Sequence, residues 1–184
     1  MKRKLFLTGP MGCGKSTAIA GAIGEKLPEF GGFLTRRARN DAGQAIAFYL
    51  ESPDGKRKEV FLNCEAALPR IDLKVFEKTA PDLLKGKYVV LDEIGGLELL
   101  CPAFMAALDN LLDSTIPVIG VVKAEGPAGA MIQKLGLTKE YEIAANRFRE
   151  KLRGDPDTLV YDCGQYDENA LRLAEQWAEE YLHD

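Results

Sequence analysis

Residues 9–16 read Gly-Pro-Met-Gly-Cys-Gly-Lys-Ser and closely follow the apolar run Leu5-Phe6-Leu7. This is Gly-x-x-x-x-Gly-Lys-Ser between an apolar strand and a helix, the pattern of a loop that binds phosphates. Its glycines let the backbone turn sharply and bring successive N–H groups close to an anion. Lys15 supplies a cation for the β- and γ-phosphates, and the Ser16 hydroxyl can ligate Mg²⁺. The stretch therefore predicts a nucleotide-binding loop.

Length and composition are those of one globular α/β domain. The chain has 184 residues, of which 28% are charged and 46% hydrophobic, and these values are ordinary for a soluble protein. No apolar run approaches the roughly 20 residues of a membrane span, and no signal-peptide core follows the basic N-terminus. Four scattered cysteines and one histidine argue against a zinc site or a disulfide framework. We expect a single domain over residues 1–184, with no membrane partner, in the reducing cytoplasm.

Charge is unevenly distributed along the chain. The net charge is −4, yet residues 1–58 carry 11 Lys and Arg against 5 Asp and Glu. The basic excess includes Arg36, Arg37 and Arg39, and it suits either an anionic ligand or a solvated surface. A net negative chain is a poor candidate for nonspecific binding of nucleic acid. Nothing in the sequence identifies a protein partner.

The hydrophobic pattern predicts an alternation of strands and helices, interrupted once. Within residues 31–62 turn signals rather than helices separate the strands, which predicts an antiparallel meander beside the main sheet. The unbroken apolar run 88–91 is typical of a central parallel strand that is buried on both faces. Strands are predicted at 4–8, 33–35, 45–50, 59–62, 88–91, 117–122, 141–143 and 158–161. Helices are predicted at 15–27, 71–84, 102–113, 128–135, 146–152 and 168–182.

A second motif follows the strand at 88–91, which runs into Asp92-Glu93-Ile94-Gly95. An acid at the end of such a strand is the companion of a phosphate loop, where it holds Mg²⁺ through the hydration shell of the ion. A carboxylate one residue further, Glu93, is placed to orient a water for attack on the γ-phosphate, or to accept its proton. A glutamate there favours hydrolysis over transfer to an acceptor. The alternative interpretation is a surface acid at a strand end.

Two cations further along the chain are candidates to complete this site. Lys123 follows the strand 117–122, which we expect beside the strand 88–91, and ligands of parallel sheets bind at the carboxyl ends of the strands. Arg147 opens the helix predicted at 146–152, and an arginine in cis can stabilise charge as the γ-phosphate departs. Arg149 and Arg153 are nearby competitors for that role.

Taken together, these features resemble the thermophile nucleoside-triphosphatases, also called cancer-related nucleoside-triphosphatases, a family of P-loop NTPases. The resemblance is carried by the N-terminal phosphate loop, by Gly32-Phe33-Leu34-Thr35 at the start of the meander, by Asp92-Glu93-Ile94-Gly95-Gly96-Leu97-Glu98-Leu99, and by Asn146-Arg147. It implies a RecA-like three-layer α/β/α fold with a mostly parallel central sheet. It also implies Mg²⁺-dependent hydrolysis of ATP, GTP and other nucleoside triphosphates to the diphosphate and phosphate.

The resemblance also assigns roles to individual residues. It implies catalytic roles for Lys15, Glu93 and Arg147, and metal ligation by Ser16 and Asp92. It marks as the phosphate loop Gly9, Pro10, Met11, Gly12, Cys13, Gly14, Lys15, Ser16 and Thr17.

Two positions depart from the family pattern. Lys123 stands near the place where relatives commonly carry a His-Arg pair, and Arg36-Arg37 stands where relatives are often acidic. The second departure puts any role for that segment in doubt. Two aromatic residues of the meander, Phe48 and Tyr49, are candidates to stack on a base, although strand aromatics more often belong to the core.

Two other functions share the phosphate loop and stay open. One is a nucleoside or nucleotide kinase, which would need a pocket for an acceptor. The other is a slow nucleotide-dependent switch or accessory module. For the latter, a nucleotide-sensitive apolar surface could be formed by Leu97, Leu99, Leu100 and Phe104.

Overall fold

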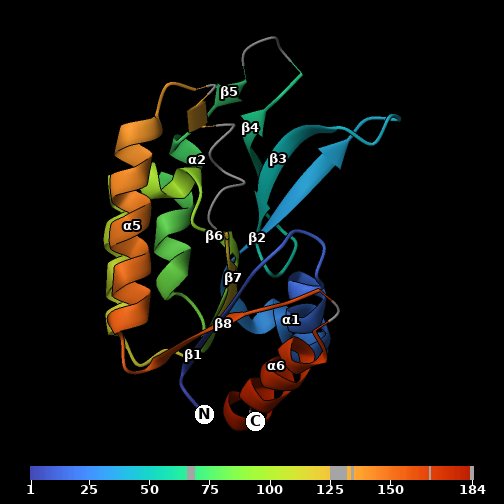
Figure 1. The fold of residues 1–184 in the computed structure, drawn as a ribbon, viewed down its shortest axis with the longest axis vertical. Coiled ribbons are helices and arrows are strands. Elements are labelled where there is room, and N and C mark those ends of the chain that lie inside the picture. Colours follow the sequence, from blue (N-terminus) through green and yellow to red (C-terminus); the bar gives the residue numbers. More distant parts are fainter. Residues whose placement is uncertain (66–68, 125–131, 134, 166, 183–184) are drawn as a thin grey trace.

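The computed structural model describes residues 1–65, 69–124, 132–133, 135–165 and 167–182. Its centre is an eight-stranded sheet in the order β5-β4-β3-β2-β6-β7-β1-β8 (Figure 1). The strands are β1 (Lys4–Thr8), β2 (Phe30–Arg39), β3 (Ala45–Glu51), β4 (Lys58–Asn63), β5 (Arg70–Ile71), β6 (Tyr88–Ile94), β7 (Val118–Val122) and β8 (Thr158–Asp162). The α-helices are α1 (Lys15–Ile23), α2 (Lys74–Thr79), α3 (Pro102–Asp113), α5 (Thr138–Gly154) and α6 (Glu168–Tyr181). Short 3₁₀ helices are η1 (Gly24–Glu29), η2 (Ala80–Leu84) and η3 (Leu97–Leu100).

Helices cover both faces of the sheet, which confirms the three-layer α/β/α architecture. In Figure 1, α1 and α6 lie on one side of the sheet, and α2 and α5 lie on the other. Strand β1 contributes side chains to the hydrophobic cores on both faces of the sheet, because successive side chains of a strand point to opposite faces. Leu5 and Leu7 belong to the core that contains Trp177 of α6, whereas Phe6 belongs to the core that contains Phe104 of α3. No helix among the described residues is long and apolar enough to cross a membrane.

The parallel half of the sheet brings the two sequence motifs to the same edge. Strand β1 pairs in parallel with β7 and β8, and β7 pairs in parallel with β6, with Val89 opposite Val118. The prediction that the strands 88–91 and 117–122 lie side by side is therefore confirmed. Val90 and Leu91 are fully buried, as expected for a central strand. Because parallel strands end at a common edge, the phosphate loop after β1 and the acids at the end of β6 come together there.

The meander is an extension of the main sheet and shares its strand β2. The first residues of β2 pair in parallel with β6, with Phe33 opposite Leu91, and the later residues pair antiparallel with β3. This ten-residue strand consequently runs past the carboxyl end of β6. It places the far half of β2, together with β3 and β4, over the edge where the phosphate loop lies.

Strand β6 is irregular where it reaches the site. Its pairing with β7 shifts between Leu91 and Ile94, and Glu93 lies in between with φ 61. Glu93 is the one non-glycine residue with positive φ among those described, a backbone conformation that costs about 1–2 kcal/mol. The irregularity lets Ile94 return to the core while Glu93 points away from it, as bulges near active sites commonly do.

The turn that follows β6 is fixed by side chains from two other elements. The buried carboxylate of Glu98 accepts hydrogen bonds from the backbone N–H groups of Gly95 and Gly96, at 2.5 and 2.6 Å. The hydroxyl of Tyr141 on α5 donates to the Gly95 carbonyl at 2.7 Å. Burial raises the pKa of Tyr141 above its ordinary value, and the charge of Glu98 raises it further, so this hydroxyl keeps its proton. The turn is therefore a rigid support for Glu93.

One predicted strand is wrong, and one prediction falls outside the described residues. The segment 141–143 is helical, because α5 runs unbroken over Thr138–Gly154 and contains the helix predicted at 146–152. Tyr141, Ala145, Phe148 and Leu152 are its buried residues, a stripe at helical spacing that a three-residue window does not reveal. Most of the helix predicted at 128–135 lies outside the described residues.

We predict that Glu98→Ala destabilises the protein by about 2 kcal/mol or more, because it leaves two buried N–H groups without an acceptor. Glu98→Gln keeps one carbonyl oxygen and should cost less. Urea unfolding measures both, with Glu175→Ala, which removes an exposed carboxylate of α6, as the matched control. Equal free energies of unfolding for Glu98→Ala and the control would contradict the supporting role.

A second prediction concerns the loop between β1 and α1. Gly9 has φ 126, and a β-carbon there would lie 2.3 Å from the backbone oxygen of Cys163; Gly12 has φ 80 and open space around it. We expect Gly12→Ala to cost about 1 kcal/mol from backbone conformation alone, and Gly9→Ala at least twice as much. Thermal unfolding of the two variants tests this, and a larger loss for Gly12→Ala would be the contrary result.

Candidate active site

The loop between β1 and α1 is closed by hydrogen bonds from Lys15, which follows it. The Lys15 ammonium donates hydrogen bonds to the carbonyl oxygens of Gly9 at 3.0 Å and Pro10 at 2.6 Å, and to the sulfur of Cys13 at 3.3 Å. Helix α1 begins at Lys15 with Gly14 as its N-cap, and neither a capping side chain nor an acidic residue occupies its first turn. The N–H groups of that turn are therefore available to an anion.

A hydrogen bond joins this loop to strand β6. The Ser16 hydroxyl donates to Asp92 Oδ1 at 2.8 Å, and the Thr35 hydroxyl of β2 donates to the Asp92 carbonyl at 2.8 Å. Burial raises the pKa of the Asp92 carboxyl above its ordinary value, and the bond from Ser16 opposes that rise. The structure thus brings together Ser16 and Asp92, two oxygen donors that are far apart in the sequence.

Glu93 is paired with an arginine from the meander. Arg37 Nη2 of β2 donates to Glu93 Oε1, and the two side chains form an ion pair. The same guanidinium lies 3.6 Å from the sulfur of Met11 in the phosphate loop and 5.7 Å from the ring centre of Phe48. Arg37 therefore connects the meander, the end of β6 and the phosphate loop.

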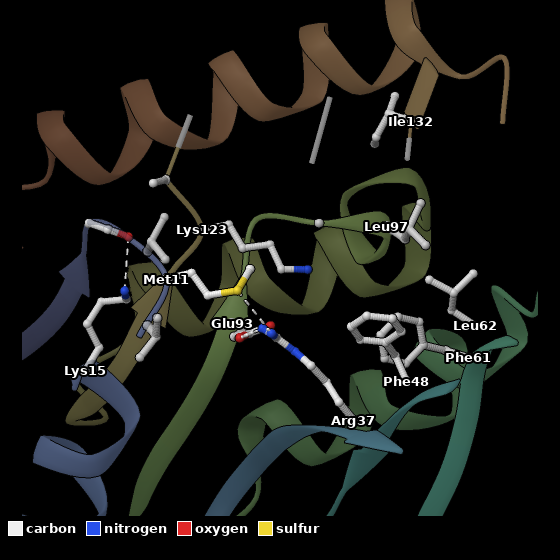
Figure 2. A pocket seen from close by; sticks show the side chains of 15 residues that line it. Met11, Lys15, Arg37, Phe48, Phe61, Leu62, Glu93, Leu97, Lys123 and Ile132 are labelled. Atoms are coloured by element: carbon white, nitrogen blue, oxygen red, sulfur yellow. Dashed lines mark hydrogen bonds and ion pairs between the residues drawn. The ribbon is translucent and has the colours of Figure 1, made fainter. Parts of the chain in front are cut away.

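These groups line a cavity of about 280 Å³, shown from close by in Figure 2. Lys15 and Met11 lie toward one end of it, and the Glu93–Arg37 pair lies in the middle. The other end is apolar, and its walls are made by Phe48, Phe61, Leu62, Leu97 and Ile132. The cavity thus extends from the glycine-rich loop, past the Glu93–Arg37 ion pair, to an apolar end.

Lys123 lies at this edge of the sheet, as the sequence leads one to expect. It lines the same cavity, and Figure 2 shows its ammonium reaching across toward Leu97. It also lines a second hollow together with Arg149 and Arg153. The role of Lys123 stays a prediction.

Arg147 is not brought to the cavity. Its side chain is exposed on α5, and it belongs to the lining of neither hollow described above. The core stripe of α5 explains this, because Phe148 faces the sheet and the residue before it turns about 100° away. Arg149, on the other flank of Phe148, lines the second hollow. The catalytic role that the resemblance implies for Arg147 stays a prediction, and this geometry gives it no support.

Arg37 is the site residue that sequence reasoning left undecided. Its neighbour Arg36 points to the other face of β2, where it pairs with Glu51 at 3.0 Å, and Arg39 donates to the Gly43 carbonyl at 2.6 Å. Strand alternation carried the signal, because Thr35 and Arg37 must share a face. Without knowledge of β2's partner, however, the sequence could not say which face meets the phosphate loop.

The comparisons with known proteins agree with this geometry. A family model described as NTPase matches residues 4–151. A human cancer-related nucleoside-triphosphatase is 30% identical over 173 residues, which cover 78% of this chain and 87% of that protein. The nucleoside-triphosphatase THEP1 of a Thermotoga species is 24% identical over 179 residues, which cover 91% of this chain and 90% of that protein.

Two solved structures share the fold. The solution structure of a human cancer-related nucleoside triphosphatase has a TM-score of 0.62 at 24% identity, covering 95% of this chain and 94% of that one. The crystal structure of THEP1 from Aquifex aeolicus has a TM-score of 0.65 at 17% identity, covering 98% and 99%. With a family model that spans most of the chain and a phosphate loop facing the acids of β6, the chain belongs to the NTPase family.

Proposed function

We propose that the protein is a Mg²⁺-dependent nucleoside-triphosphatase that hydrolyses ATP, GTP and other nucleoside triphosphates to the diphosphate and phosphate. The observation that carries the proposal is the contact of Ser16 with Asp92 at 2.8 Å, with Glu93 next in sequence lining the same cavity as Lys15. The relatives named above are nucleoside-triphosphatases, which supports the same activity.

The residues at this edge fit Mg²⁺. The Ser16 hydroxyl and the Asp92 carboxylate are hard oxygen donors that already lie within hydrogen-bond distance of each other. The described residues include no cluster of three or more His, Cys, Asp or Glu that could enclose a metal ion. That agrees with Mg²⁺, which protein sites hold through one or two side chains, water and substrate phosphates. When bound, the ion neutralises charge on the phosphates.

The chain's own residues supply the rest of the mechanism. The Lys15 ammonium exchanges its carbonyl partners in the loop for phosphate oxygens, and the N–H groups of the first turn of α1 bind the same anion. Glu93 orients a water in line with the γ-phosphorus and accepts its proton. Glu93 is partly buried, so these electrostatic interactions are screened less than they would be in bulk water.

The substrate range is proposed to be broad, because the chain has no motif that reads a particular base, such as Asn-Lys-x-Asp. The cytoplasm is proposed as the compartment, and the four free cysteines agree with a reducing environment. The switch interpretation loses its main support, since Leu97, Leu99 and Phe104 are buried and Leu100 is partly buried against the same core.

The test is phosphate release from ATP, GTP, CTP and UTP with Mg²⁺. Glu93→Gln should lower kcat by about 10²- to 10⁴-fold, the usual contribution of a general base, while the affinity for nucleotide persists. Lys15→Ala should lose affinity as well. Glu142→Gln, which alters an exposed carboxylate of α5, is the control. Tight nucleotide binding without phosphate release by the wild-type protein would overturn the proposal.

The apolar end of the cavity favours one second candidate, a kinase that transfers the γ-phosphoryl group to a small acceptor. A transferase needs space for an acceptor beside the γ-phosphate, and the apolar side chains beyond Glu93 line such a space. A small acceptor with an apolar or aromatic body and one hydroxyl group would fit these walls.

This candidate is tested by ³¹P NMR of reactions that contain ATP, Mg²⁺ and either nucleosides, nucleoside monophosphates or benzyl alcohol. We expect phosphate ester from the acceptor that fits the cavity, with inorganic phosphate as the competing product. Inorganic phosphate alone in every reaction would leave hydrolysis as the function. Glycerol, which has hydroxyl groups without an apolar body, is the matched control.

A further inference from the structure

We propose that Arg37 is the arginine of this site that responds to the γ-phosphate. It pairs with Glu93 in this structure, and it shifts to the γ-phosphate when a nucleoside triphosphate binds, which releases the Glu93 carboxylate to the attacking water. The inference rests on the proposed triphosphatase activity.

The first support is the position of the guanidinium. It contacts Glu93 and lies 3.6 Å from the sulfur of Met11, which belongs to the phosphate loop. Figure 2 shows Arg37 reaching from the meander into the middle of the cavity, with its head group at Glu93 and beneath Met11. Lys15, which binds β- and γ-phosphates in such loops, lines the same cavity. A short side-chain movement along this cavity brings the guanidinium to the γ-phosphate.

The second support is electrostatic. A γ-phosphate bound at Lys15 would place its negative charge beside the Glu93 carboxylate, and like charges at such distances repel each other strongly in a partly buried site. Arg37 can relieve this conflict, because its positive charge attracts both anions. Guanidinium groups form strong hydrogen bonds with both carboxylates and phosphates, so Arg37 can exchange one partner for the other. A diphosphate offers no γ-phosphate, so with it Arg37 stays on Glu93.

The third support is that the other arginines near this edge do not line the cavity. Arg36 pairs with Glu51 on the opposite face of β2, Arg147 is exposed, and Arg149 and Arg153 line the second hollow. Among the described residues that line the Lys15–Glu93 cavity, Arg37 is the one arginine.

Arg37 acts while water attacks the γ-phosphate. The water oxygen forms a bond to the γ-phosphorus, and the bond from that phosphorus to the oxygen bridging to the β-phosphorus breaks. The bonding electron pair leaves with the nucleoside diphosphate, and the proton of the water passes to the Glu93 carboxylate. Arg37 stabilises the negative charge on the transferred group during this step, as arginines do in related phosphoryl transfers.

The experiment compares Arg37→Gln, Arg37→Lys and Arg39→Gln. Arg39→Gln is the matched control, because it removes the same charge two residues further along β2, where Arg39 is exposed and donates to the Gly43 carbonyl. Steady-state phosphate release gives kcat and KM, and calorimetry gives the dissociation constants of a nonhydrolysable ATP analogue and of ADP. Thermal unfolding of each variant reports whether the fold is kept.

We expect Arg37→Gln to lower kcat by about 10²- to 10³-fold. It should reduce the preference for the ATP analogue over ADP by about tenfold, while the affinity for ADP changes less than about twofold. Arg37→Lys should restore part of kcat because it returns a cation, and Arg39→Gln should resemble the wild type.

Three results would overturn the inference. A kcat for Arg37→Gln equal to or above that of the wild type would show that the ion pair only restrains Glu93. Parallel losses of affinity for the analogue and ADP would show that Arg37 only maintains the loop. Equal effects of Arg39→Gln and Arg37→Gln would show that only the overall positive charge of β2 matters. Failure of the proposed function is distinguishable, because then the wild type itself releases no phosphate, whereas the two dissociation constants still test Arg37.

Discussion

Parallel pairing of β6, β7 and β1 is the constraint on which the rest of the molecule depends. It forces the ends of β1 and β6 to one edge of the sheet, and only there can the Ser16 hydroxyl reach Asp92 at 2.8 Å. Side chains of both strands belong to the two hydrophobic cores on either face of the sheet. Packing in both cores therefore stabilises the position of this edge. The chemistry of the site is consequently a property of strand register as much as of the residues in the two motifs.

The sequence predicted the parts of the fold whose signals are local. The phosphate loop, the buried strand 88–91 and its neighbour 117–122 each carry their signal within a few residues, and the structure confirms these elements. The strand predicted at 141–143 is wrong because the pattern of three residues cannot distinguish a short strand from one turn of a helix. The signal in α5 lies in the spacing of Tyr141, Ala145, Phe148 and Leu152, which only a window of a dozen residues reveals.

The residues of the candidate site also differ in whether a local sequence pattern identifies them. Lys15, Asp92 and Glu93 could be named because each stands in a motif with a fixed spacing, and their proposed roles await the activity measurements. Arg37 stands in no motif, and its contact with Glu93 depends on how β2 pairs with β6 and β3. Arg147 illustrates the converse: a motif names the residue, but the buried face of α5 directs its side chain outward. Long-range pairing, which no local pattern encodes, decides both cases.

Because Arg36 and Arg37 are adjacent in β2, a one-residue insertion and a one-residue deletion in this strand have different effects on the cavity. Side chains alternate along a strand, so inserting one residue between Phe33 and Arg36 would move Arg36 into the place that Arg37 now holds. Deleting one residue there would instead bring Ala38 into that place and leave Glu93 without its cation. These shifts are counted from Phe33, because its pairing with Leu91 of β6 fixes its position in the sheet. Variation in this strand should thus retain a guanidinium in the cavity after an insertion and lose it after a deletion.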